Sequence, residues 1–287
     1  MSGTTKGLRK FLDASPLAAL VEVSEARGST PREKGAWMLV TPTAIFGTIG
    51  GGQLEFMAID QAREVIARKG EERAILDIPL GPEIGQCCGG RVELSITVID
   101  EPAKAELIAA AEAEDAKLPH IHVFGGGHVG HALASAFALL PVHVVVVETR
   151  ADALDGIPEC IETRLTSVPE EMVGDAPAGS AFVVLTHDHA LDFLIVAEAL
   201  KRKDAAYVGM IGSKTKKATF KSWYLKTAGG TEMDFSRLVS PIGGDAVNDK
   251  RPAVIAALAA AEIMTALVAC STAVPLSNQR SVRMSAG

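Results

Sequence analysis

The chain has 287 residues, of which 48% are hydrophobic and 22% charged, so we expect one large or two ordinary globular domains and no extensive disorder. Its net charge of −7 argues against nucleic acid or an anionic membrane as a general partner, because phosphate groups are bound by basic surfaces. Four cysteines are too few for a disulfide scaffold, and no signal peptide is evident, so we expect a cytoplasmic protein.

The first hundred residues contain short strand-like runs separated by turn residues. Residues 17–26 begin after Pro16, and residues 91–99 are rich in β-branched side chains, which favour strands. Between them, apolar side chains recur at roughly helical spacing from about residue 53 to 69. We expect an α/β protein whose N-terminal mixed α/β domain covers residues 1–101, with further strands at 36–40, 45–47 and 73–78.

A helix is expected next, because residues 102–118 are rich in Ala, Glu and Lys, which are good helix formers. We expect this segment to be a helical linker that ends at Pro119.

Strands and helices alternate after Pro119. Residues 142–147 form a continuous β-branched run, as expected for a strand that is covered on both faces. This alternation predicts a Rossmann-like domain with a doubly wound parallel sheet over residues 119–270, followed by a flexible tail over 271–287. The other expected elements are strands at 121–124, 181–185 and 206–211 and helices at 127–140, 190–201 and 213–227.

The segment from Pro252 to Cys270 is apolar apart from Glu262 and is about long enough to cross a bilayer. A carboxylate near the centre of a membrane helix is costly, and the segment lacks flanking aromatic residues. We therefore expect a buried or domain-bridging helix and no membrane partner.

Two adjacent cysteines, Cys87 and Cys88, lie inside the run Gly85-Gln86-Cys87-Cys88-Gly89-Gly90. Neighbouring side chains do not share a face of a helix or strand, and zinc sites favour spaced cysteines. A soft thiol pair with glycines on both sides suits a ligand that contains sulfur or a soft metal. The alternative is that both residues are small buried hydrophobic side chains.

A glycine-rich turn, Gly125-Gly126-Gly127-His128-Val129-Gly130, matches the pattern G-x-G-x-x-G between an expected strand and helix. Gly125 allows the turn, Gly127 allows a pyrophosphate to approach the backbone, and Gly130 allows the helix to pack on the strand. Glu148 ends the next strand, where an acid binds a ribose hydroxyl in dinucleotide folds. Such a fold leaves the ligand open, and a repurposed pocket is an alternative.

Two loops follow later strands of the expected parallel sheet, at the edge where such sheets bind ligands. His187 and His189 in the first loop suit metal ligation or proton transfer, or are structural and exposed. In the second loop Ser213 is a candidate N-cap, and Lys214 suits an anion such as a phosphate monoester. The alternative is an ordinary capped helix with a solvated basic face that includes Lys216 and Lys217. His120, His122 and His143 are expected to be core or edge residues.

Several motifs together resemble the XdhC/CoxI family, the xanthine dehydrogenase accessory proteins. The resemblance extends from about Leu17 to Leu267, and the double-cysteine run is its most specific part. It rests on residues 28–32 (GSTPR), 47–55 (GTIGGGQLE), 85–90 (GQCCGG), 123–130, 186–192 (THDHALD) and 207–213 (YVGMIGS).

The resemblance implies a protein that binds the molybdenum cofactor, protects it during sulfuration and inserts it into apo-xanthine dehydrogenase, without catalysis of its own. Cys87 and Cys88 would face the molybdenum. The implied partners are the molybdenum subunit of that dehydrogenase, a cysteine desulfurase and a second copy of the chain. The implied cofactor-binding residues are Gly50, Gly51, Gly52, Gln53, Glu55, Gln86, Cys87, Cys88, Gly125, Gly127, His128, Gly130, Glu148, His187, Ser213 and Lys214.

The chain departs from the family pattern at Ser240-Pro241-Ile242-Gly243-Gly244, where a Cys-Pro-Ile-Gly-Leu run is usual, and at His131, where arginine is common. Two other functions remain open. One is an NAD(P)-dependent oxidoreductase that uses the glycine-rich turn, although the chain has no Tyr-x-x-x-Lys pair. The other is a thiol-based redox sensor, because adjacent cysteines can form a labile disulfide.

Overall fold

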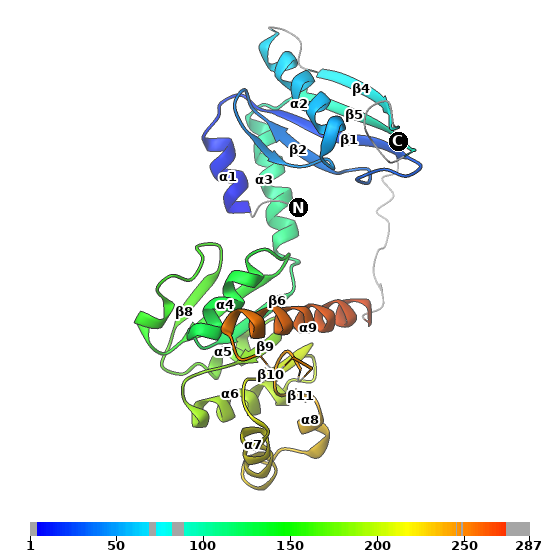
Figure 1. The fold of residues 1–287 in the computed structure, drawn as a ribbon. Helices are drawn as coiled ribbons and strands as arrows, with labels where there is room; N and C mark the ends of the chain where they lie inside the picture. Colours follow the sequence, from blue (N-terminus) through cyan, green and yellow to red (C-terminus); the bar gives the residue numbers. More distant parts are fainter. Residues whose placement is uncertain (1–4, 69–72, 82–88, 245, 248, 274–287) are drawn as a thin grey trace, which may run out of the picture. The chain divides into compact units, whose positions relative to one another are not determined.

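The computed structural model describes residues 5–68, 73–81, 89–244, 246–247 and 249–273 (Figure 1). The chain divides into two compact units, Met1–Lys117 and Leu118–Gly287, and each is described by itself.

The first unit is built on an antiparallel five-stranded sheet with the order β3-β2-β1-β5-β4. Alternating buried and exposed side chains along β1 are typical of a strand within such a sheet. The strands are β1 (Ala19–Arg27), β2 (Trp37–Val40), β3 (Ile45–Gly47), β4 (Arg73–Pro79) and β5 (Arg91–Val98).

Helices cover both faces of this sheet. On one face, α2 (Gly52–Ala67) buries Leu54 and Ala58 against the strands. On the other face, α1 (Thr5–Asp13) and α3 (Glu101–Asp115) contact one another and the sheet. The sequence pattern does not predict α1, because it is short and buries only Leu8 and Leu12.

The helix α3 occupies most of the segment expected to be a linker, residues 102–118. It begins after Asp100, whose carboxylate accepts a 2.9 Å hydrogen bond from the backbone N–H of Ala103. Leu107 and Ile108 pack in the cluster that also holds Leu8. This helix is therefore an integral part of the first unit.

The second unit contains a parallel six-stranded sheet with the order β11-β10-β9-β6-β7-β8. Numbered from its first strand, this order is 6-5-4-1-2-3, the doubly wound order of dinucleotide-binding folds. The expected Rossmann-like domain is thereby confirmed. Its strands are β6 (His120–Phe124), β7 (His143–Glu148), β8 (Glu162–Leu165), β9 (Ala181–Val184), β10 (Tyr207–Met210) and β11 (Leu238–Val239).

Helices again lie on both faces of the sheet (Figure 1). One core cluster joins α4 and α9 to the strands, and the other joins α5, α6, α7 and α8 to the opposite face. The bounds are α4 (His128–Phe137), the 3₁₀ helix η2 (Ala151–Leu154), α5 (Glu171–Asp175), α6 (His189–Lys201), α7 (Lys214–Lys226), α8 (Glu232–Ser236) and α9 (Pro252–Ala273).

By length and composition alone, α9 is the one helix among the described residues that could cross a membrane. In the structure it packs along α4, with Ala256, Ala259 and Ile263 buried in the core. Glu262 accepts a 2.5 Å hydrogen bond from the hydroxyl of Tyr207. The carboxylate that interrupts the apolar run thus has a polar partner inside the unit.

Candidate functional site

Three glycine-containing loops meet in the first unit. A Cβ atom on Gly50 would lie 2.5 Å from the Cβ of Pro31, and one on Gly90 would lie 2.4 Å from the carbonyl oxygen of Ser29. Real Cβ atoms do not approach so closely, so glycine is needed at both contacts. The loop that holds Arg32 therefore lies against the other two glycine loops of the first unit.

The third of these loops carries the cysteine pair. Gly89 and Gly90 are described, whereas Gln86, Cys87 and Cys88 lie outside the described residues. Among the residues that the structure does describe, no three His, Cys, Asp or Glu side chains are grouped so that they could hold a metal ion.

The glycine turn before α2 adopts a backbone that other residues rarely adopt. Gly50, Gly51 and Gly52 have φ angles of 125°, 77° and 65°. A Cβ atom on Gly51 would contact nothing within 4 Å, so the turn has open space beside it. Gln53 follows in the first turn of α2 and is exposed.

Glu55 stabilises this turn from inside. Its carboxylate accepts hydrogen bonds from the hydroxyl of Thr48 (2.5 Å) and the backbone N–H groups of Ile49 (3.1 Å) and Gly51 (3.1 Å). The bond to Gly51 satisfies the N–H of the N-cap residue of α2, and the bond to Ile49 satisfies an N–H of the turn before it. Its observed partners are in the turn, whereas the family resemblance implied that it binds the cofactor.

In the second unit, the glycine-rich turn lies where the strand order reverses. Strands β6 and β9 are neighbours, and a Cβ atom on Gly125 would lie 2.5 Å from the carbonyl oxygen of Leu185 at the end of β9. One on Gly130 would lie 2.0 Å from the carbonyl oxygen of Gly125, which explains the close packing of α4. Gly127, in contrast, has open space beside it.

Glu148 is buried and bonded to the backbone around it. Its carboxylate accepts hydrogen bonds from the N–H groups of Gly126 (2.8 Å), Thr149 (2.8 Å) and Arg150 (3.1 Å). Burial alone would raise the pKa of Glu148, but these hydrogen bonds outweigh it and lower the pKa to about 2. The carboxylate expected to bind a ribose instead holds the glycine-rich turn.

Replacing Glu148 by glutamine is expected to lower the free energy of unfolding by about 1–3 kcal/mol, because an amide NH₂ then faces a backbone donor. Urea denaturation at neutral pH measures the loss, with Glu198→Gln as the control at a half-exposed ion pair. Equal stability of the two variants would contradict the structural role of Glu148.

A buried ion pair joins α6 and α7, the helices that follow β9 and β10. Asp192 is 0% exposed and Lys216 is 9% exposed, and the Lys216 ammonium donates to the Asp192 carboxylate. The other oxygen of Asp192 accepts from the backbone N–H (2.9 Å) and hydroxyl (2.7 Å) of Thr186. The interpretation of Lys216 as part of a solvated basic face is therefore wrong: its stem packs under Gly212 and its ammonium is buried.

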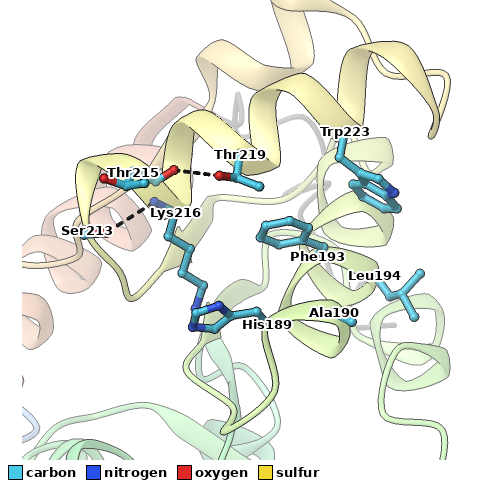
Figure 2. A pocket seen from close by; sticks show the side chains of 9 residues that line it. All are labelled: His189, Ala190, Phe193, Leu194, Ser213, Thr215, Lys216, Thr219 and Trp223. Atoms are coloured by element: carbon cyan, nitrogen blue, oxygen red, sulfur yellow. Dashed lines mark hydrogen bonds between the residues drawn. The ribbon is translucent and has the colours of Figure 1, made fainter.

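A cavity of about 590 Å³ lies between α6 and α7 (Figure 2). Phe193 and Trp223, whose ring centroids are 5.7 Å apart, form its apolar wall. His189 and Ser213 lie at its polar end, and Figure 2 shows the side chain of Lys216 passing toward His189. The cavity joins an aromatic surface to a small polar end.

The remaining candidate residues lie at the beginnings of helices or, for His187, in the loop before one. Ser213 is the N-cap of α7 and accepts a 3.3 Å hydrogen bond from the backbone N–H of Lys216, which confirms the predicted cap. His128, His187 and Lys214 are exposed. Neither His187 nor Lys214 lines the cavity between α6 and α7.

Comparison with known proteins assigns both units. A model of the XdhC and CoxI family matches residues 12–78, and a model of the XdhC Rossmann domain matches residues 121–263. The chain belongs to the XdhC family. The resemblance read from the sequence motifs is thereby confirmed.

One curated relative and one solved structure show how far the likeness of this XdhC-family chain extends. Protein YqeB of Escherichia coli (strain K12), described as uncharacterized, is 26% identical over 267 residues, which are 86% of this chain and 43% of that protein. The chain thus spans less than half the length of this curated relative. A structure from Bacillus halodurans, described as a xanthine dehydrogenase, matches with a TM-score of 0.73 and 16% identity over 96% of this chain and 98% of that chain. At this identity the match shows a common fold.

The sequence-predicted residues of this XdhC-family protein fall into two groups. The turn at Gly50–Gly52, with Gln53 and Glu55, belongs to the first unit. The glycine-rich turn and Glu148 lie at the carboxyl ends of β6 and β7, and the loops with His187 and Ser213 follow β9 and β10. Sequence reasoning missed Asp192 as a buried partner, although its motif THDHALD contains it.

Proposed function

We propose that this protein binds the molybdenum cofactor, protects it while a terminal sulfur is installed, and inserts it into apo-xanthine dehydrogenase. The observation that carries the proposal is the meeting of three glycine loops in the first unit, one of which continues directly from Cys87 and Cys88. Membership of a family of xanthine dehydrogenase accessory proteins supports the same accessory role.

The chemistry of these loops suits holding and release. The turn at Gly50–Gly52 has free space beside its backbone, so a ligand can approach the backbone closely there. The adjacent thiols suit a centre made of molybdenum and sulfur. A carrier must release its cargo unchanged, so we propose that the protein has no turnover of its own.

The proposed partners follow from this role. They are the molybdenum subunit of the dehydrogenase, which receives the cofactor, and a cysteine desulfurase, which supplies sulfur. We also propose that the carrier is a homodimer. We propose that it acts in the cytoplasm, where the apo-enzyme is assembled.

An NAD(P)-dependent oxidoreductase is the second candidate. The open backbone at Gly127, at the point where the strand order reverses, favours it. Against it, the carboxylate of Glu148 is bonded to three backbone N–H groups, where a dinucleotide site needs it for ribose. Fluorescence titration with NADH separates the two functions, and tight binding with turnover of a hydroxy acid would favour the oxidoreductase.

The double variant Cys87→Ala/Cys88→Ala is expected to fold normally and to retain about tenfold less molybdenum cofactor. Anaerobic gel filtration with cofactor released from a donor molybdoenzyme measures co-elution of molybdenum and pterin. Cys160→Ala is the control, because Cys160 is an exposed cysteine of the second unit. If the wild-type protein does not bind the cofactor, the proposed function is wrong. If the double variant retains it fully, the thiols serve packing alone.

A further inference from the structure

A second cavity, of about 270 Å³, lies wholly inside the first unit. One wall is the sheet face formed by β2 and β3, and the other is made by α1 and α3. Arg32 and Thr48 also line it, and they belong to two of the three glycine loops that meet in this unit. The cavity therefore adjoins the site of the proposed function.

The sheet side of this cavity is flat and aromatic. The rings of Trp37 and Phe46 are stacked, with centroids 6.3 Å apart and planes inclined by 25°. Both side chains are only partly buried, and Leu8 and Leu107 enclose the space from the helices. Both residues line the cavity, and aromatic rings in a cavity wall suit a flat ring system.

Charged groups of opposite sign accompany the aromatic surface. Glu114 and Asp115 line the cavity from the end of α3. Asp115 accepts two hydrogen bonds from Thr5 through Oδ2, and Glu114 binds Lys117 through Oε1. Within the described part of the chain, the second oxygen of each carboxylate and the guanidinium of Arg32 have no hydrogen-bond partner. As far as the described residues go, the cavity thus offers carboxylate acceptors and a cationic donor around an apolar floor.

We propose that this cavity binds the pterin ring of the molybdenum cofactor, with the anionic arm of the cofactor held by Arg32. The inference rests on the proposed function and assigns one end of its ligand. A pterin is flat and carries an amino group beside a ring N–H, a pair of donors that carboxylate oxygens accept. Arginine suits phosphate because its planar fork donates two parallel hydrogen bonds.

The size of the cavity favours a binding mode in which the pterin ring lies inside and the rest of the cofactor lies outside. Ligand pockets range from about 300 to 1,000 Å³, so the cavity takes a two-ring heterocycle and leaves the rest of the cofactor outside. Arg32 and Thr48 mark the side on which the glycine loops meet. The sulfur-bearing part of the cofactor then extends toward the loop that continues from Cys88.

Filling the cavity tests the inference. Ala110 is exposed on α3 and lines the cavity, whereas Ala109, its neighbour on the same helix, is exposed and does not line it. Ala110→Trp is expected to retain about tenfold less cofactor in anaerobic gel filtration, and Ala109→Trp to bind like the wild type. Circular dichroism and urea denaturation show whether both variants fold equally well.

The outcomes separate this inference from the proposed function. If the wild type binds cofactor and Ala110→Trp binds it equally well, the ring lies elsewhere and the proposed function stands. If the wild type does not bind, the proposed function fails first. If Ala110→Trp is misfolded, the fluorescence experiment decides.

A fluorescence experiment provides the second readout. The chain has two tryptophans, so Trp223→Phe leaves Trp37 as the sole reporter. Bound cofactor is expected to quench Trp37 by stacking near it, and Arg32→Gln is expected to weaken binding about tenfold without changing the maximal quench. Lys34→Gln, two residues away and exposed, is the control. Cofactor binding without a change in Trp37 emission would overturn the inference.

Discussion

Lys216→Met is expected to lower the free energy of unfolding by about 3–5 kcal/mol, because it leaves the carboxylate of Asp192 buried without a counter-charge. Asp192 is 0% exposed, so water cannot replace the lost ammonium. The pair also joins α6 to α7 and, through Thr186, to the loop after β9. Urea denaturation of the purified full-length chain, followed by circular dichroism, measures the loss.

A matched lysine on the same helix provides the control. Lys221 forms a 3.0 Å ion pair with Glu232, and both side chains are exposed (42% and 67%). Exposed pairs contribute about 0–1 kcal/mol, so Lys221→Met is expected to cost little. A Lys216→Met loss no larger than that of Lys221→Met would contradict the buried pair.

Adding Asp192→Asn to Lys216→Met tests the cause of the loss. Asparagine carries no charge, yet its carbonyl oxygen still accepts from the backbone N–H of Thr186. We expect the double variant to be more stable than Lys216→Met, because the unpaired buried charge is gone. Equal stability of the two would instead assign the loss to the packing of the lysine stem under Gly212.

Much of the second unit is predictable from its sequence, because buried parallel strands have long apolar runs. The runs in β7 and β9 are continuous, and β6 is apolar apart from its two histidines, which leads to the correct sheet class. The edge strand β8, Glu-Thr-Arg-Leu, is polar and largely exposed, so no apolar pattern reveals it. The two-residue strand β11 is too short to give a pattern.

The candidate site is less predictable than the fold, because its contacts join residues far apart in the chain. The glycines at 125 and 130 follow from one local motif, and their close contacts agree with it. The partners of Glu148 and Lys216 depend on tertiary packing, which the spacing of residues along the sequence does not predict. From the sequence alone, a charged residue beside a glycine turn is therefore interpreted as a ligand contact. The same pattern arises when the charged side chain binds the turn itself.

The buried imidazole of His122 is expected to make the protein lose stability as the pH falls from about 6.5 to 4. His122 is 4% exposed, and its Nδ1 has no hydrogen-bond partner among the described residues. Burial, together with the nearby imidazoles of His120 and His143, lowers its pKa from 6.5 to about 4. The carboxylate of Glu162 opposes this shift in pKa, and the guanidinium of Arg202 adds to it.

The sign follows from the two protonation states. Below pH 6.5 His122 is protonated in the unfolded chain, whereas in the folded chain it stays neutral until the pH falls to about 4. Stability is therefore fully present above pH 6.5 and is lost as the pH falls through that window. A shift of this size corresponds to about 3.5 kcal/mol, at about 1.4 kcal/mol per pH unit.

His122→Phe is expected to flatten this pH dependence, because phenylalanine binds no proton and the site already contacts the rings of Phe124 and Phe182. Urea denaturation at pH 7, 6, 5 and 4 measures how the free energy of unfolding of each protein changes with pH. Each protein is compared with its own value at pH 7, so any packing cost of the substitution cancels. His187→Phe, at an exposed histidine, is the control and is expected to keep the wild-type slope. A residual slope in His122→Phe is expected from His120, whose pKa burial also lowers. A slope unchanged from the wild type would show that His122 takes up its proton as readily in the folded protein as in the unfolded chain.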